Sequence, residues 1–127
     1  MKTILLIAAI INLAVGAVHT FVGEPQVVAP LLGSNTPDLV KGTLHSSWHM
    51  TTVVLFLSSF TLFFLSRRDP GDQLCKSLPV YIGIQYVGLA LVFVVTSFLY
   101  GQFFIQILML LPIGLLSLWA GKMANTA

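Results

Sequence analysis

The chain has 127 residues, of which 57% are hydrophobic and 8% are charged, with a mean hydropathy of +0.95 and a net charge of +2. A typical soluble domain carries about 25% charged residues, so this composition excludes an ordinary water-soluble protein and indicates a membrane protein. The small net charge argues against a nucleic-acid partner. Because Cys75 is the only cysteine, an internal disulfide and a paired-thiol redox motif are also excluded.

Four apolar runs are long enough to cross a bilayer, which takes about 20 residues. Backbone polar groups in lipid must be satisfied within the segment, so each run is expected to be a helix. The sequence therefore predicts one all-α domain, residues 1–127, built as a four-helix transmembrane bundle. The expected spans are residues 4–22, 44–65, 79–100 and 103–120.

The basic residues predict the orientation of this bundle. If the four helices alternate in direction, one side carries Lys2, Arg67, Arg68, Lys76 and Lys122. Only Lys41 falls on the other side. Cytoplasmic loops carry the excess of lysine and arginine, so both termini are expected in the cytoplasm. The protein would then lie in a bacterial inner membrane, with residues 23–42 facing outward, into the periplasm of a Gram-negative source.

Residues 23–42 are predicted to form an outer lid loop. Their apolar residues are bracketed by Pro25, Pro30 and Gly33, which is typical of a short segment lying on the membrane surface. Thr36-Pro37-Asp38 has the residue types of a helix start. The second helix is therefore expected to begin near Pro37 and to project slightly from the membrane.

The stretch TLHSSWHMTT, residues 43–52, places two histidines at the start of the second span. His45 and His49 are four residues apart and share one helix face. At a rise of about 1.5 Å per residue, His19 reaches nearly the depth of His49. If the first two helices pack through Gly16, all three rings can meet. The sequence therefore predicts a metal site of His19, His45 and His49, with Glu24 as a fourth ligand or as the carboxylate that orients a ring.

The identity of the metal is left open by these ligands, because imidazole binds copper, zinc and iron. Three protein ligands with an open position are typical of a catalytic or exchange site, and four are typical of a structural or electron-transfer site. Whether the protein is an enzyme stays open. Haem would need opposite axial ligands from different helices, here His19 and His49, and the surplus third histidine favours a simple ion over haem.

Other polar residues of the spans are expected to face the interior of the bundle, because lipid penalises them. Near the level of the histidines, the predicted pocket residues are Trp48, Thr52, Thr96, Ser97, Tyr100 and Gln106. A second, inner polar layer is predicted from Asn12, Ser59 and Gln85. Gly16 and Gly88 are expected to be packing notches between helices.

Several other interpretations of these patterns stay open. An H-x-x-x-H pair also arises by chance, and Trp48 can belong to an aromatic belt while His49 donates to a carbonyl or to Gln106. The small polar faces would then serve helix association in a non-catalytic subunit of a larger membrane complex or in a homo-oligomer. A quinone pocket lined by His49, Trp48, Gln106 and Tyr100 is another alternative. A small dimeric transporter is disfavoured because all four acidic residues fall in predicted loops.

Residues 16–52 carry a recognisable pattern. GAVHTFVGEPQVVAPLLGSN, followed by LVKGTLHSSWHMTT, combines an H-x-F-x-G-E helix end, a P-L-L loop and a W-H pair near the start of the second span. This pattern resembles a group of small, uncharacterised four-helix bacterial inner-membrane proteins. The resemblance implies the topology and draws attention to His19 and His49, with Trp48 alongside. It implies no activity.

Overall fold

The computed structural model describes residues 1–126, and its regular elements are all helices. In chain order they are α1 (Lys2–Val18), η1 (His19–Val28), α2 (Ala29–Gly33), α3 (Asp38–Ser66), α4 (Gln73–Tyr100) and α5 (Gln106–Thr126). The segment η1 is a π-helix, and it joins α1 to α2 in one helical stretch. The predicted all-α architecture of four packed helices is confirmed.

Four helical stretches are long and apolar enough to cross a membrane: Lys2–Gly33, Asp38–Ser66, Gln73–Tyr100 and Gln106–Thr126. Many of their large apolar side chains point away from the protein. Phe98 is 84% exposed and Leu39 is 83% exposed. Such exposure is unfavourable in water but suits contact with lipid tails. By helix length and hydropathy, the chain is a multi-pass membrane protein, as predicted.

The segment predicted to be an outer lid is instead mostly helical. The first helix continues through η1 and α2 to Gly33, and only residues 34–37 separate it from α3. Prolines end many helices, but Pro30 lies in the first turn of α2, where the missing N–H costs little. Pro25 is accommodated within η1. The start of α3 at Asp38, directly after Pro37, agrees with the predicted helix start.

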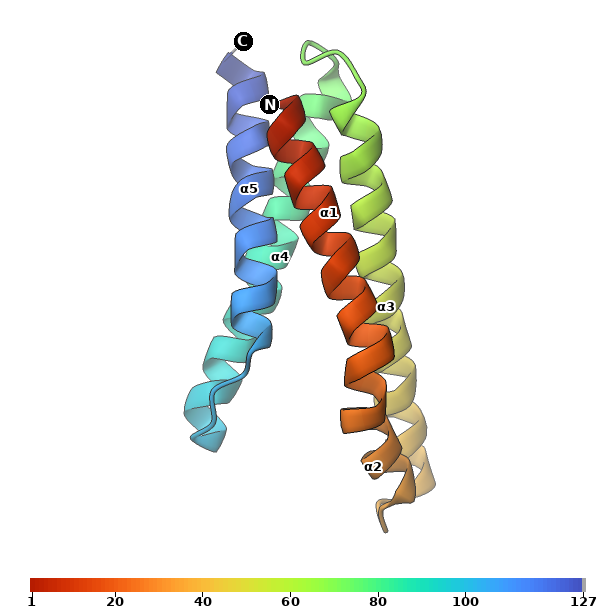
Figure 1. Ribbon diagram of the computed structural model, residues 1–127. Helices are drawn as coiled ribbons and strands as arrows, with labels where there is room; N and C mark the ends of the chain where they lie inside the picture. The colour runs from red at the N-terminus through yellow and green to blue at the C-terminus, as the bar shows by residue number, and fades with distance from the viewer. Residues whose placement is uncertain (127) are drawn as a thin grey trace.

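The four helices form two hairpins. The stretch from α1 to α2 runs along α3, α4 runs along α5, and α1 also packs on α5. In Figure 1 the hairpins meet at the end that carries both termini and diverge toward the opposite end. We call residues 1–12, 58–90 and 110–126 the closed end, and residues 13–57 and 91–109 the open end. At the open end the α1–α3 hairpin extends beyond the α4–α5 hairpin, and α3 has 29 residues whereas α5 has 21.

Glycines bring α4 and α5 close together at the closed end. A Cβ atom on Gly83 would lie 2.6 Å from Leu118 Cγ and 2.9 Å from the Gly114 carbonyl oxygen. A Cβ on Gly114 would lie 2.9 Å from Val87 Cγ2. No real side chain tolerates such distances without movement of its neighbours. The missing side chains therefore set the spacing of this hairpin, as is common for small residues in membrane helices.

The two glycines predicted to be packing notches differ in the structure. Gly16 is buried against α3, where an added Cβ would lie 3.4 Å from the Phe56 ring. Gly88 faces open space, with nothing near an added Cβ. The prediction for Gly88 is wrong because α4 contacts α5 along the neighbouring face that contains Gly83.

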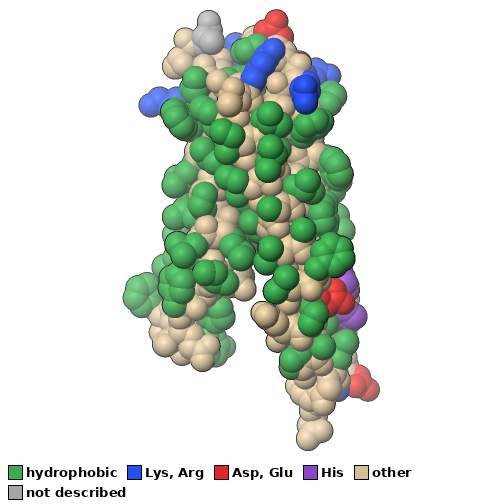
Figure 2. Space-filling model, viewed as in Figure 1, with side chains coloured by type: hydrophobic (Ala, Val, Ile, Leu, Met, Phe, Trp, Pro, Cys, Tyr) green, Lys and Arg blue, Asp and Glu red, His purple; other side chains and the backbone are tan. Residues whose placement is uncertain are grey.

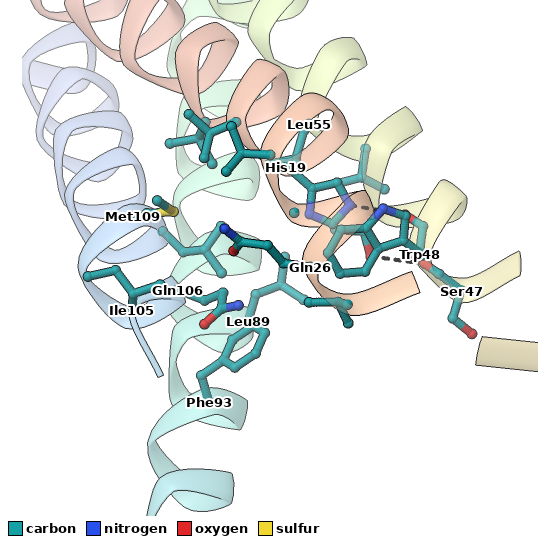
Figure 3. A pocket seen from close by; sticks show the side chains of 18 of the residues that line it. His19, Gln26, Ser47, Trp48, Leu55, Leu89, Phe93, Ile105, Gln106 and Met109 are labelled. Carbon is teal, nitrogen blue, oxygen red and sulfur yellow. Dashed lines mark hydrogen bonds between the residues drawn. The ribbon is translucent and has the colours of Figure 1, made fainter. Parts of the chain in front are cut away.

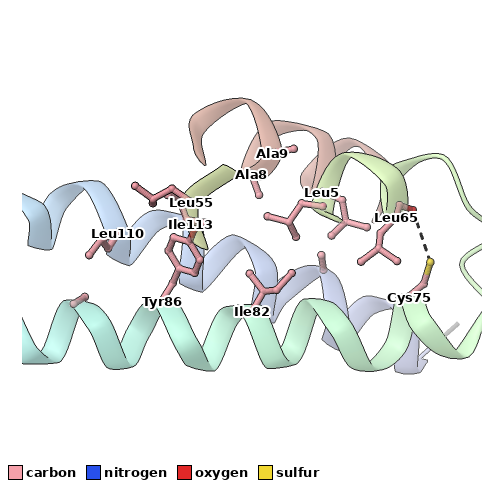
Figure 4. Close-up of a cluster of buried hydrophobic side chains, with 13 residues drawn as sticks. Leu5, Ala8, Ala9, Leu55, Leu65, Cys75, Ile82, Tyr86, Leu110 and Ile113 are labelled. Carbon is pink, nitrogen blue, oxygen red and sulfur yellow. Dashed lines mark hydrogen bonds between the residues drawn. The ribbon is translucent and has the colours of Figure 1, made fainter. Parts of the chain in front are cut away.

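The hydrophobic core joins all four helices at the closed end (Figure 4). Its buried side chains include Leu5, Ala8 and Leu62 from the first hairpin and Ile82, Tyr86 and Ile113 from the second. Small residues on α1 allow the larger residues of α3 and α4 to approach. This core holds the two hairpins together at one end and leaves the other end free to diverge.

A buried hydrogen-bond network crosses this core. The Asn12 amide donates to the Leu55 carbonyl oxygen at 3.1 Å and to Ser58 Oγ at 2.9 Å. Tyr86 donates its hydroxyl hydrogen to Asn12 Oδ1 at 2.9 Å, and its oxygen also lies within hydrogen-bond distance of Ser58. Three helices are therefore tied together by side chains that satisfy one another, which is what a low-dielectric interior requires.

The predicted inner polar layer of Asn12, Ser59 and Gln85 is only partly assembled. Ser59 donates to the Ala9 carbonyl oxygen at 2.8 Å and links α3 to α1. Gln85 is half-buried, and its amide has no hydrogen-bond partner in residues 1–126; its neighbour Tyr86 takes the place expected for it. Tyrosine was overlooked because it is less polar than glutamine, although its hydroxyl needs a partner when buried.

Candidate functional site

The outer part of α3 presents two different faces. His45 and His49, four residues apart, lie one above the other on one face, and Trp48 lies about 100° around the helix from its neighbour His49, toward the adjoining face. Figure 2 shows histidine and acidic side chains together on the side of the α1–α3 hairpin that is turned away from α4 and α5. Trp48 instead faces the space between the two hairpins (Figure 3).

The outer face of α3 carries a group that could hold a metal ion. The Nε2 atoms of His45 and His49 are 2.9 Å apart, so one ring donates a hydrogen bond to the other. Glu24, from η1, completes the group: its carboxylate and the two imidazoles offer ligand atoms that all lie within 4.8 Å of one another. His49 is exposed, while His45 and Glu24 are half-buried. The group is therefore open to the surroundings of the protein.

His19 does not join this group, although the sequence predicted it as a ligand. Its ring stacks on Trp48, with centroids 3.9 Å apart and planes inclined by 16°. Its Nε2 atom donates to the Trp48 carbonyl oxygen at 3.2 Å. His19 therefore reaches the expected segment of α3 but contacts the adjoining face, at Trp48. Haem with His19 and His49 as opposite axial ligands also finds no support, since the two rings have different partners.

The rotation of α3 explains why His19 is not a ligand. Asn12, Gly16 and His19 share one face, as predicted, and this face packs on α3. The α3 residue that meets His19 is Trp48, whereas the two ligand histidines lie further around the helix. Beyond His19 the first helix is a π-helix with i→i+5 hydrogen bonds and wider turns, and Glu24 on this segment reaches the histidine pair.

Only some of the predicted pocket residues lie together. Trp48 and Gln106 line a common cavity, whereas Thr52, Thr96, Ser97 and Tyr100 do not. Each of the three hydroxyl residues donates to a carbonyl oxygen of its own helix: Thr52 to Trp48, Thr96 to Val92 and Ser97 to Phe93. Tyr100 is 72% exposed at the end of α4. These four side chains therefore have local partners or face outward.

The cavity lies between the two hairpins at the open end and has a volume of about 560 Å³. Most of its lining is apolar, including Leu55, Leu89 and Phe93, and its polar side chains include His19, Gln26 and Gln106. Gln26 was missed because residues 23–42 were expected to form a loop. It lies seven residues after His19, which would have placed it on the same face of a continuing helix.

Comparisons with models of protein families, with curated proteins and with solved structures found no match to this chain. The resemblance noted in residues 16–52 is therefore supported only for its topology, four helices that are candidate membrane spans. Any function has to be inferred from the geometry of the histidine group and of the cavity.

Proposed function

We propose that this protein binds a transition-metal ion in the membrane through Glu24, His45 and His49. The observation that carries the proposal is the convergence of one carboxylate and two imidazoles from two separate helices, η1 and α3, within 4.8 Å. Ionisable residues are rare in membrane-spanning segments and are usually partnered or functional. Here a carboxylate from η1 lies beside a histidine pair on α3, so the group is assembled by packing and not by helix spacing alone.

Only a small adjustment would be needed to form the site. Two nitrogen ligands at about 2.0–2.1 Å from a tetrahedral ion are separated by roughly 3.3 Å, compared with 2.9 Å between the two Nε2 atoms here. Small side-chain rotations would admit the ion between the two imidazoles, where it would replace the shared proton, and would bring in the Glu24 carboxylate, which lies within 4.8 Å of both. Because imidazoles and carboxylates must be free of protons to bind the ion, protons and metal compete for this site.

The ligand set leaves coordination positions open. Two histidines and one carboxylate are used by catalytic zinc sites with a bound water and by non-haem iron sites with free positions; copper also accepts imidazole. An ion held in this way can take a further ligand from water, from a small molecule or from another protein. The site would therefore support exchange of the ion, redox chemistry or a structural role in an assembly.

The charge distribution supports an outward-facing site. The basic residues other than Lys41 lie near the closed end, around the termini and the α3–α4 turn. With the closed end in the cytoplasm, the histidine group would face the periplasm of a bacterial inner membrane. At about 1.5 Å per residue, α3 exceeds a hydrocarbon core of about 30 Å, so His45 would lie near the membrane surface.

The test is metal binding by the detergent-purified protein after treatment with a chelator. Isothermal titration with Zn²⁺ should give one ion per chain, and Co²⁺ should give visible absorption bands from nitrogen and oxygen ligands. His45→Gln and His49→Gln should each weaken binding by about 100-fold or more, beyond the 10–100-fold typical of residues that only orient a ligand. Glu24→Gln keeps the shape of the side chain and should weaken binding by at least about tenfold.

His19→Gln is the matched control, because it replaces the remaining histidine of the chain, which stacks on Trp48 and contributes no atom to the metal group. Its metal affinity should change by less than about tenfold, below the effect expected for loss of a ligand. Loss of binding in His19→Gln with retention in His45→Gln would overturn the proposed ligand set. If the wild-type protein bound less than about 0.1 ion per chain, a tenth of full occupancy, metal binding itself would be contradicted.

A further inference from the structure

The cavity between the hairpins shares no residue with the proposed metal site and lies beside the adjoining face of α3, which carries Trp48. Its walls come from α1 and η1 with α3 on one side and from α4 with α5 on the other. A volume of about 560 Å³ falls within the range of roughly 300–1,000 Å³ that small-molecule sites occupy. Figure 3 shows that side chains from both hairpins point into this space. The cavity can therefore contact one ligand from two sides.

Three neutral polar side chains converge on the cavity: His19, Gln26 and Gln106. Because the His19 Nε2 atom donates to the Trp48 carbonyl oxygen, a neutral ring carries its proton there and leaves Nδ1 as an acceptor. In Figure 3 this second nitrogen points toward the cavity, and so do both glutamine amides. The cavity thus offers hydrogen-bond donors and acceptors to a ligand whose head reaches between the two hairpins.

A flat aromatic wall lies beside these polar groups. His19 and Trp48 are stacked nearly parallel, and Gly23 allows the indole to pack directly on the helix backbone, since a Cβ there would lie 2.9 Å from the Trp48 ring. The Trp48 Nε1 atom is buried without a hydrogen-bond partner in residues 1–126. Such an orphaned donor is costly, so packing alone does not satisfy every polar group of this wall.

The absence of charge narrows the ligand class. Lys, Arg, Asp and Glu are missing from the cavity lining found in residues 1–126, so the phosphate of a phospholipid would have no counter-charge. A neutral ring with carbonyl or hydroxyl groups can stack on the aromatic wall and bond to the glutamines. Because the hairpins diverge, the rest of the ligand can extend between them into the lipid.

We propose that this cavity binds a neutral, ring-headed lipid-soluble molecule of the quinone or quinol class. The ring stacks beside His19 and Trp48, its oxygen atoms hydrogen-bond to Gln26 and Gln106, and its apolar tail follows the groove lined by Leu89 and Phe93. The proposal is independent of the metal site, since no residue of the Glu24, His45 and His49 group lines the cavity.

The chain contains two tryptophans, which gives a built-in comparison. Trp48 lies at the cavity, whereas Trp119 is 56% exposed on α5 and does not line the cavity. The Trp119→Phe variant leaves Trp48 as the reporter, and the Trp48→Phe variant leaves Trp119. Each variant is titrated in chelator-treated detergent solution with a benzoquinone that carries a ten-carbon tail, and tryptophan fluorescence is measured. The fluorescence of Trp48 should fall along a saturating curve. The fluorescence of Trp119 should fall only in proportion to the quinone concentration in the micelle.

Further arms of the experiment test the placement of the ring. Gln106→Leu in the Trp119→Phe background should weaken the saturable phase about three- to tenfold, as expected for loss of one hydrogen bond. Phosphatidylglycerol added in excess should not displace the quinone. Linear quenching of both tryptophans, or displacement by the phospholipid at equal concentration, would overturn the proposal. Because the chelator removes metal ions from the sample, the quinone titration gives the same result whether or not the protein can bind metal.

Discussion

The closed and open ends of the bundle differ in how their polar side chains are hydrogen-bonded. At the closed end Asn12, Ser58 and Tyr86 bond to one another inside a packed core. At the open end His45 and His49 pair only with each other beside Glu24, and the indole of Trp48 is left without a partner. One end uses polarity to join helices, and the other end keeps ligand atoms and hydrogen-bonding groups available.

This difference separates structural polar residues from candidate functional ones. The closed-end side chains satisfy one another across three helices, whereas the open-end histidines bond only within their pair and the Trp48 Nε1 atom has no partner in residues 1–126. The Ser117 hydroxyl on α5 is an exception at the closed end, because it is buried without a partner. The comparison predicts that substitutions at the closed end change stability and that substitutions at the open end change binding.

The largest effect on stability is expected at the glycine contact between α4 and α5. Gly83→Leu would force a side chain into Leu118 and the Gly114 backbone, and overpacking of this kind costs about 1–3 kcal/mol or more. The variant should lose the folded, monodisperse state in detergent, as measured by size-exclusion chromatography and thermal unfolding. Gly88→Leu is the control, since its added side chain meets open space. Equal effects of the two substitutions would contradict the packing described for the closed end.

The next effect is expected from the buried network. Asn12→Leu keeps the volume of the side chain but removes its bonds to Leu55, Ser58 and Tyr86, which should lower the free energy of unfolding by about 2 kcal/mol. Unfolding in sodium dodecyl sulfate, followed by circular dichroism, would measure the change. Gln85→Leu should change it by less than about 0.5 kcal/mol. If Gln85→Leu proved the more damaging, the network would be assigned to the wrong residues.

The smallest effect is expected at the turn before α4. The Leu74 backbone N–H donates to the Asp72 carboxylate and Arg68 pairs with it, and together these lower the pKa of Asp72. Because the folded-state pKa is the lower one, the stabilisation is complete above the unfolded-state pKa and is lost as the pH falls through the folded-state pKa.

Asp72→Asn should therefore reduce the melting temperature slightly at neutral pH. The difference from the wild type should shrink as the pH falls through the folded-state pKa of Asp72, because the aspartate then loses its charge. Thermal unfolding at several pH values would measure this. A difference that grew on acidification would contradict the assigned partners of Asp72.

Much of the fold could be predicted from the sequence because lipid imposes simple rules on it. The length of the apolar runs predicted four helices, and the i, i+4 spacing placed His45 beside His49, since both follow from α-helix geometry alone. Glu24 was proposed from its position after the first span, and the structure brings it to the same group. These predictions needed no knowledge of how the helices pack.

The remaining features depend on backbone geometry and packing, which the residue pattern does not specify. The π-helix at His19–Val28 continues the first helix into the expected lid, and the rotation of α3 places Trp48, and not the two ligand histidines, against His19. The choice of Gly83 over Gly88, and of Tyr86 over Gln85, depends on which face of α4 meets α5 and α3. The rotation of α4 about its own axis decides both which glycine and which polar residue face the other helices. Several such rotations are compatible with the same pattern of hydrophobic residues.

The most direct test of the metal-binding claim is anomalous diffraction at the zinc edge from crystals grown with Zn²⁺. We expect one peak per chain within about 2.0–2.2 Å of a nitrogen of His45, a nitrogen of His49 and a carboxylate oxygen of Glu24. No peak is expected beside His19, whose ring is stacked on Trp48. A peak bound to His19, or no peak at the three proposed ligands, would contradict the account.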